Sequence, residues 1–289
     1  MWILFAVLGA IAKALTSALR KKISYVSSPV YVFMSMGIVA VILSTVSLFL
    51  PSESIGSTLN NPPLLLVLGL INIAALRLNL FAFKHEELSY ITPMFALTPI
   101  YAALFAFVTI GEQPSALGLL GVITITIGVY IVTKTNGVSF KDSLLRITQN
   151  KGARAGMLVP IAYAAGSTIN KDLLNQGVTP LASVAAVTAI MSLWHVYVIP
   201  FRRQELADTL SNAKLTKTII LTAVLGVGSI GFAALALNDA FTSYTLSIRR
   251  LDVLITVIIG WKFMNDSNTK QRLIGAVILT AGVVFVSFG

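Results

Sequence analysis

Five charged side chains fall near the middle of long apolar stretches of this sequence, where charge is rare. Four are basic and one is acidic, namely Lys13, Arg77, Arg249, Arg250 and Asp252. A charge at the centre of a membrane helix costs about 2.5–3.5 kcal/mol on insertion scales, so these residues are candidates for function. Their excess of positive charge suits a carboxylate or phosphate group on a bound solute. Two alternatives stay open: Asp252 neutralises some of these groups in a fixed network, or Lys13 and Arg77 extend toward a membrane interface.

Polar neighbours extend this candidate site. Arg249 and Asp252 are three residues apart, so they can pair on one helical face. Thr98 and Tyr101 come from another apolar stretch, and we expect them to line the same central cavity. Adjacent arginines favour the ionised form of Asp252, which makes it a weak candidate for a proton site. Coupling to a proton or to a counter-substrate therefore stays open.

Other kinds of chemistry find little support in the sequence. There is no cysteine, which excludes disulfides and thiolate metal sites. With two histidines in total, a histidine-built metal site is not expected, and His195 is interpreted as a hydrogen-bonded residue near the end of its helix. Residues 226–231 fit G-x-G-x-x-G, but they lie inside an apolar stretch and follow no strand. We therefore expect no enzyme, no metal and no cofactor.

The elements that position these residues are predicted to be membrane helices. Hydrophobic residues make up 56% of the 289 positions and charged residues only 11%, whereas a soluble domain carries about 25% charged residues. A helix needs about 20 apolar residues to cross the hydrocarbon core. Ten such stretches can be delimited, at 2–19, 29–50, 63–83, 89–110, 115–133, 156–174, 180–200, 218–238, 242–263 and 272–288.

The basic residues outside these stretches predict the orientation. The loops that follow the odd-numbered stretches hold sixteen lysines and arginines, whereas the termini and the other loops hold one, Lys171. Because basic loops stay in the cytoplasm, both termini should face outward. This placement also explains the net charge of +10 without a nucleic-acid partner. Two polar segments, 134–154 and 201–217, suit either a short helix on the membrane surface or a solvated loop.

The chain also contains an internal repeat. A shift of 154 positions superposes residues 89–132 on 243–286 without a gap, and it matches Gly121 with Gly275 and Gly128 with Gly282. Each half then holds five stretches. Because five is odd, the second half begins on the opposite side of the membrane, and the halves are inverted repeats. This plan is common in secondary transporters, which bind the substrate between the halves.

The repeat carries a family resemblance. Residues 96–112, followed by Leu120-Gly121 and Gly128-Val129, resemble the fourth and fifth helices of the EamA-like branch of the drug/metabolite transporter superfamily. The second half repeats the pattern from Arg249-Arg250 to Gly282. The resemblance implies export or exchange of small organic solutes such as amino acids, metabolites, nucleotide sugars and drugs. This chain departs from the family in having Val253 where its first half has Pro99. Its charges also place both termini outside, whereas ten-helix members of the family are usually drawn with both termini in the cytoplasm.

The sequence thus predicts an all-α, polytopic protein of the inner or plasma membrane, with ten transmembrane helices in two inverted five-helix repeats. The repeats are residues 1–133 and 156–289, joined by a polar loop at 134–155. The predicted function is a secondary transporter, an exporter or exchanger, that works by alternating access on a small molecule, one with an anionic group. A scaffold or receptor without transport, or a lipid-handling membrane protein, is the alternative. The predicted site residues are Lys13, Arg77, Thr98, Tyr101, Arg249, Arg250 and Asp252.

Overall fold

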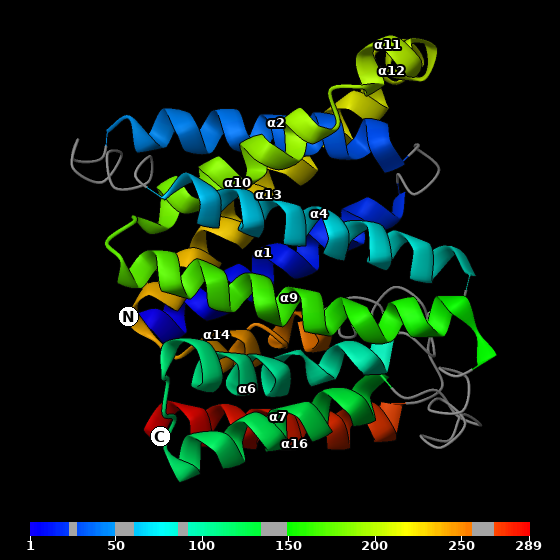
Figure 1. Cartoon of the computed structure of the whole chain (residues 1–289). Helices are drawn as coiled ribbons and strands as arrows, with labels where there is room; N and C mark the ends of the chain where they lie inside the picture. Colours follow the sequence, from blue (N-terminus) through cyan, green and yellow to red (C-terminus); the bar gives the residue numbers. More distant parts are fainter. Residues whose placement is uncertain (23–27, 50–60, 86–91, 134–148, 256–268) are drawn as a thin grey trace.

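The computed structural model describes residues 1–22, 28–49, 61–85, 92–133, 149–255 and 269–289. Across these ranges the ordered elements are all helical, which confirms the predicted fold class at that level (Figure 1). In chain order they are α1 (Trp2–Lys22), α2 (Ser28–Ser47), α4 (Pro62–His85), η1 (Thr92–Leu97), α6 (Thr98–Ile110), α7 (Ala116–Thr133), α9 (Lys151–Asn175), α10 (Pro180–Trp194), α11 (Val198–Phe201), α12 (Arg203–Ser211), α13 (Ala213–Asp239), α14 (Thr242–Ile248) and α16 (Thr269–Phe288).

Several helix ends follow from local sequence. Asn150 begins α9, and its side chain accepts a hydrogen bond from the backbone N–H of Gly152. Asn212 caps α13 in the same way, with Leu215 as the donor. Gly111 ends α6 in the left-handed region, at φ 68°, a conformation that costs glycine nothing. Short polar signals therefore divide a chain that is otherwise almost continuously apolar.

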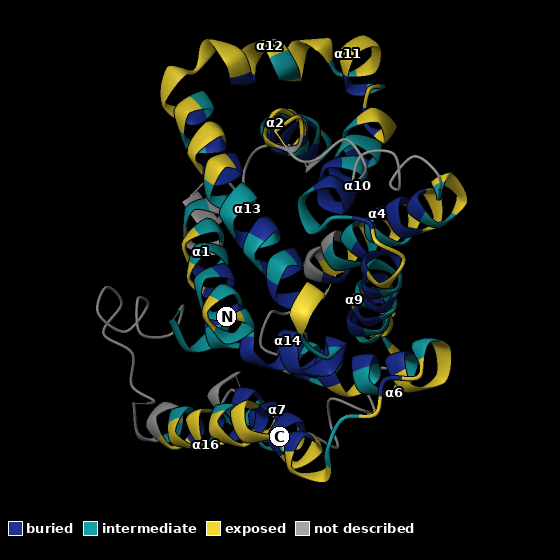
Figure 2. Cartoon of the chain, turned by 90° about the vertical axis from the view of Figure 1, so that its left-hand side faces the viewer, coloured by how far each residue is buried: buried dark blue, intermediate teal, exposed yellow. Residues whose placement is uncertain are grey.

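Helices from the two halves of the chain pair with one another. α1 lies against α13, α4 against α9, α2 against α10, and α7 against α16 (Figures 1 and 2). If the halves are exchanged, so that α1 corresponds to α9 and α4 to α13, the α1–α13 pair becomes the α9–α4 pair. The other two pairs map onto themselves. This exchange symmetry fits the repeat architecture that the sequence predicts.

The contact between α7 and α16 shows the same exchange at the level of atoms. A Cβ placed on Gly128 would lie 2.7 Å from the backbone nitrogen of Leu279, and one on Gly282 would lie 2.7 Å from that of Ile125. A shift of 154 positions converts the first contact into the second. Glycines at these positions let the two backbones approach closely, as small residues do between membrane helices.

The outer surface of this bundle is apolar. Large hydrophobic side chains are exposed on several helices, with exposed fractions of 66% at Val41, 68% at Leu193 and 71% at Val108 (Figure 2). Such a surface suits contact with lipid. Four helical stretches in the described ranges are long and apolar enough to cross a membrane: Pro29–Val46, Pro62–Asn79, Pro180–Phe201 and Ala213–Asp239. Ten spans stay a prediction.

Two predicted connections differ from what the structure shows. α9 begins at Lys151, inside the segment 134–155 that is predicted to be a loop, because Asn150 provides the N-cap. The segment 201–217 is helical, with α11 and α12 followed by the start of α13, so its solvated-loop alternative is wrong. Residues 134–148 lie outside the described residues.

Candidate functional site

The ninth predicted stretch is interrupted where its charges lie. α14 ends at Ile248, residues 249–250 form a turn, and helix resumes at 251–255. The backbone N–H of Asp252 donates to the carbonyl of Arg249 at 3.2 Å, and that of Arg250 donates to Ser247 at 3.0 Å. These three-residue hydrogen bonds wind the chain more tightly than an α-helix does. In the first half η1 is also tightly wound, and the shift of 154 positions places it on residues 246–251.

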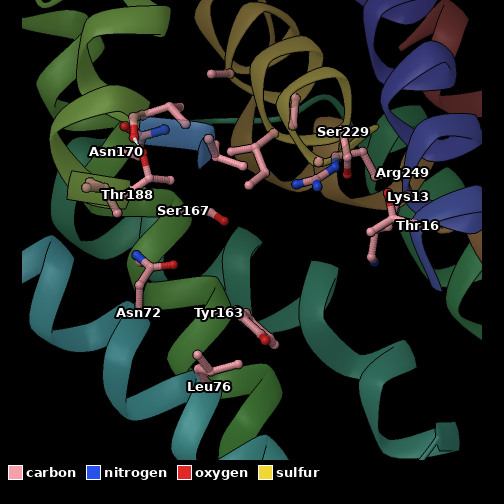
Figure 3. A pocket seen from close by; sticks show the side chains of 18 of the residues that line it. Lys13, Thr16, Asn72, Leu76, Tyr163, Ser167, Asn170, Thr188, Ser229 and Arg249 are labelled. Carbon is pink, nitrogen blue, oxygen red and sulfur yellow. Dashed lines mark hydrogen bonds between the residues drawn. The ribbon is translucent and has the colours of Figure 1, made fainter. Parts of the chain in front are cut away.

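A cavity of about 570 Å³ lies between the halves, beside this interruption (Figure 3). Side chains from α1, α2, α4, η1, α6, α7, α9, α10, α13 and α14 line it together with residues between 249 and 253. Five of the seven predicted site residues are among them: Lys13, Thr98, Arg249, Arg250 and Asp252. The volume falls in the range of about 300–1,000 Å³ that is typical of small-molecule sites.

The charged side chains on one wall of the cavity connect the two halves. The Nζ of Lys13 lies 2.7 Å from Oδ2 of Asp252, and Asp252 is 8% exposed. A guanidinium nitrogen of Arg250 donates a hydrogen bond to the hydroxyl of Thr98, which itself donates to the carbonyl of Phe95 at 2.7 Å. The Nε of Arg249 is buried and finds no hydrogen-bond partner among the described residues. Lys13, Thr98, Arg249, Arg250 and Asp252 form the basic wall of the cavity.

The basic wall carries an excess of positive charge. Over the described residues that line the cavity, three basic side chains, Lys13, Arg249 and Arg250, face one carboxylate, that of Asp252. Two positive charges are therefore left without a carboxylate in a region of low dielectric, where Coulomb interactions are stronger than in water. An anionic group on a solute would balance part of this charge.

The described side chains of the wall across the cavity include a polar, uncharged group. This group contains Asn72 of α4, Tyr163, Ser167 and Asn170 of α9, and Thr188 of α10 (Figure 3). The amide nitrogen of Asn72 donates to the carbonyl of Leu68 at 2.9 Å, and the hydroxyl of Thr188 donates to that of Val184 at 2.8 Å. The side-chain oxygen of Asn170 is buried and accepts no hydrogen bond from any described residue. Asn72, Tyr163, Ser167, Asn170 and Thr188 form the neutral wall of the cavity.

Two predicted site residues lie elsewhere. Arg77 is exposed and does not line the cavity; its guanidinium carbon lies 5.8 Å from the centre of the Trp194 ring. Tyr101 packs against the cluster of Ala102, Ala164 and Leu246 and does not line the cavity either. A charge is easily noticed in an apolar stretch, but its position along the chain does not show which way its helix is turned.

Part of the neutral wall was not predicted from the sequence. Tyr163 and Ser167 are not among the predicted residues, although with Asn170 they recur at intervals of four and three positions along α9. That spacing places side chains on one helical face, so a search for polar stripes could have found them. His195, by contrast, is 4% exposed and its Nδ1 lies 2.7 Å from the carbonyl oxygen of Met191, which confirms its interpretation as a hydrogen-bonded residue.

Two further charged side chains, those of Glu112 and Lys171, connect helix ends away from the cavity. The carboxylate of Glu112 accepts hydrogen bonds from the backbone N–H of Thr242, at 2.8 and 3.1 Å, and from its hydroxyl at 2.9 Å. Burial raises the pKa of Glu112, while these bonds and the charge of Lys171 act in the opposite direction. The Nζ of Lys171 donates to the carbonyls of Leu237 and Asn238, at 2.8 and 2.9 Å, and so caps α13.

Comparisons with known proteins give the same architecture. The model of the EamA-like transporter family matches residues 1–134 and 150–288. A solved structure that is described only as the crystal structure of a protein superposes with a TM-score of 0.78 at 11% sequence identity. The match covers 99% of this chain and 96% of that one, and at this identity it shows the shared fold alone. No curated protein matches the chain.

Proposed function

The chain belongs to the EamA-like transporter family, and we propose that it is a secondary carrier that moves a small organic anion across the cell membrane. The family supports transport of small solutes through a membrane and is not a family of enzymes. The proposal adds the mode of transport, which is alternating access as an exporter or exchanger, and the charge of the solute. As the sequence predicts, the proposed carrier has ten spans in two repeats, at 1–133 and 156–289, and both of its termini face outward.

The basic wall carries the proposal. Lys13, Arg249 and Arg250 face a single carboxylate among the described lining residues, and the Nε of Arg249 has no described partner. Buried charges and buried donors are costly when they lack partners. A carboxylate or phosphate on the solute would accept hydrogen bonds from these groups and would offset their charge.

Alternating access is supported by where the contacts of this wall lie. Lys13 and Thr98 belong to the first half, while Arg250 and Asp252 belong to the second. A solute anion that binds Lys13 and Arg250 competes with Asp252 and Thr98, so its binding changes contacts between the halves. Discontinuous helices beside a site between repeats are typical of secondary carriers. The contacts of Glu112 and Lys171 join α6, α9, α13 and α14 at the other end of α14.

The first test is the thermal stability of the purified protein in detergent against matched ligands. The panel contains carboxylates, sugar phosphates, nucleotides, neutral amino acids and cationic drugs. A ligand that binds only the folded protein at a hundredfold excess over its Kd adds about 2.7 kcal/mol of stability. We expect anions alone to shift the midpoint, and we expect Arg250→Met to abolish the shift while Arg77→Met preserves it.

The same experiment separates the alternatives. If cations or neutral solutes shift the midpoint and anions do not, the basic wall is a fixed structural network and the anionic solute is wrong. If no solute in the panel shifts it and none is transported by proteoliposomes, the chain acts as a scaffold or receptor. Formation of a product from an added lipid would indicate lipid handling.

A further inference from the structure

The neutral wall lies opposite the basic wall in a cavity that is larger than one anionic group requires. A carboxylate bound by Lys13 and Arg250 leaves most of the 570 Å³ for the rest of the solute. Apolar side chains such as Val39, Leu68 and Met191 also line the cavity, so its surface is not uniformly polar. The remainder of the solute must therefore satisfy a localised polar surface that faces the anion site.

The neutral wall offers both hydrogen-bond acceptors and hydrogen-bond donors. The amide nitrogen of Asn72 already donates to Leu68, and the hydroxyl proton of Thr188 is directed at Val184. For a ligand these side chains keep their oxygen lone pairs and the second amide hydrogen of Asn72, and the amide of Asn170 and the hydroxyl of Ser167 can also donate. The oxygen of Asn170 is a buried acceptor that no described residue satisfies. A solute group that satisfies this wall must donate a hydrogen bond to Asn170 and can also accept hydrogen bonds from the amides.

The donors are expected to be uncharged. The described residues of the neutral wall include no carboxylate, and Asp252, the one acidic residue among the described lining residues, lies 2.7 Å from the ammonium of Lys13. An ammonium group placed among amides and hydroxyls would be buried without a counter-charge, which is costly. Hydroxyl groups donate without that cost, and they can also accept hydrogen bonds.

Resting on the proposed transport of an anion, we infer that the neutral wall is a second subsite that binds hydroxyl groups of the solute. The substrate class is then a hydroxylated organic anion, with its acidic group at the basic wall and its hydroxyls at Asn72, Asn170 and Thr188. Recognition requires both ends. A carboxylate without hydroxyls leaves the buried acceptor of Asn170 unsatisfied, and such a loss is a strong source of discrimination.

The test uses three ligands with the same carbon chain: hexanoate, gluconate and 6-aminohexanoate. Their Kd values are measured by calorimetry on the purified full chain. Gluconate is expected to bind at least tenfold more tightly than hexanoate, and 6-aminohexanoate no more tightly than hexanoate. Equal binding of gluconate and hexanoate, with both lost in Arg250→Met, would overturn the hydroxyl subsite and leave the proposed anion transport standing. If none of the three binds and no other anion stabilises the protein, the proposed function fails as well.

Substitutions at Asn170 then place the subsite. In Asn170→Leu the ratio of gluconate affinity to hexanoate affinity is expected to fall about fivefold to tenfold. In Asn170→Asp the new carboxylate should raise the affinity for 6-aminohexanoate relative to hexanoate, because it supplies the missing counter-charge. The ratios cancel any general effect on carboxylate binding. Asn175→Leu is the matched control, since Asn175 is exposed near the end of the same helix and should leave both ratios unchanged. If Asn170→Leu and Asn175→Leu behave alike, the assignment to this wall is wrong.

Discussion

The ion pair between Lys13 and Asp252 allows a quantitative prediction. At the observed 2.7 Å, two unit charges attract by about 6 kcal/mol at an effective dielectric constant of 20. Desolvation removes much of this, and the Lys13 side chain keeps 36% of its surface exposed, against 11% for Asp252. The net coupling should therefore lie above the 0.2–1 kcal/mol of exposed pairs. We expect about 2 kcal/mol, below the roughly 3–5 kcal/mol lost when a fully buried pair is broken.

The perturbation is a double-mutant cycle with Lys13→Met, Asp252→Asn and the double variant. Asp252→Asn should be the more destabilising single change, because it leaves the three basic side chains facing one another. After Lys13→Met, Asp252 still faces Arg249 and Arg250. The double variant should lose about 2 kcal/mol less than the two single losses together.

The assay is the free energy of unfolding of the purified variants, measured by titration with dodecyl sulfate in mixed micelles. Arg77→Met is the matched control, because Arg77 is also a charge in an apolar helix but is exposed beside Trp194. It should cost no more than about 1 kcal/mol, the size of an exposed cation–π contact. If the losses at Lys13 and Asp252 are additive within error, the pair contributes nothing and the reasoning is refuted.

The remaining predictions concern helix packing at Gly128 and the contacts of Glu112 and Lys171. Gly128→Leu should prevent folding or lower the unfolding temperature sharply, because its Cβ would lie 2.7 Å from the backbone of Leu279. Gly231→Ala should be tolerated, because the nearest side-chain atom lies 3.5 Å from the position of its Cβ. Similar yields and unfolding temperatures for the two variants would contradict the close contact at Gly128. Glu112→Gln should gain stability relative to the native chain as the pH rises. Because its pKa is raised in the folded state, the folded chain binds more protons than the unfolded chain. The native chain therefore loses stability as the pH rises from about 4.5, the ordinary pKa of glutamate, through the raised pKa of Glu112. A stability difference that does not change with pH would show that burial does not perturb this carboxyl. Lys171→Met should lower the free energy of unfolding by roughly 2–3 kcal/mol in the mixed-micelle titration, because it removes two charged hydrogen bonds to carbonyls at the end of α13. A loss of under about 0.5 kcal/mol would show that Lys171 does not cap this helix.

The helical architecture was predictable because membrane solvation leaves few choices. A backbone in hydrocarbon must satisfy its own hydrogen bonds, so long apolar stretches form helices, and caps such as Asn150 and Gly111 divide them. The glycines shared at a spacing of 154 residues place small residues on one helical face, which indicates helices that can pack closely. The structure confirms close packing for Gly128 and Gly282.

The candidate site was predictable only in part. Charges in apolar helices are conspicuous, and this pattern located Lys13, Arg249, Arg250 and Asp252. Periodicity suggests that Arg249 pairs with Asp252 along one helix, whereas the structure brings Lys13 to Asp252 from α1. That contact depends on how two distant helices pack. The interruption of the helix at residues 249–250 also changes which side chains share a face.

The neutral wall was harder to predict for a physical reason. Asparagine, serine and threonine are tolerated in apolar helices because they can bond to the carbonyl four residues earlier, as Asn72 and Thr188 do. Taken one at a time, such residues do not indicate a site. Their meaning here comes from α4, α9 and α10 facing one cavity.

Counterflow in proteoliposomes tests the central claim most directly. Vesicles that contain the purified chain are loaded with the anion that gives the largest thermal shift, and uptake of the same labelled anion is followed in the native chain, Arg250→Met and Arg77→Met. We predict transient accumulation in the native chain and in Arg77→Met, and none in Arg250→Met. Equal accumulation in all three would show that the basic wall does not bind the anion. No accumulation in the native chain would contradict transport of that anion.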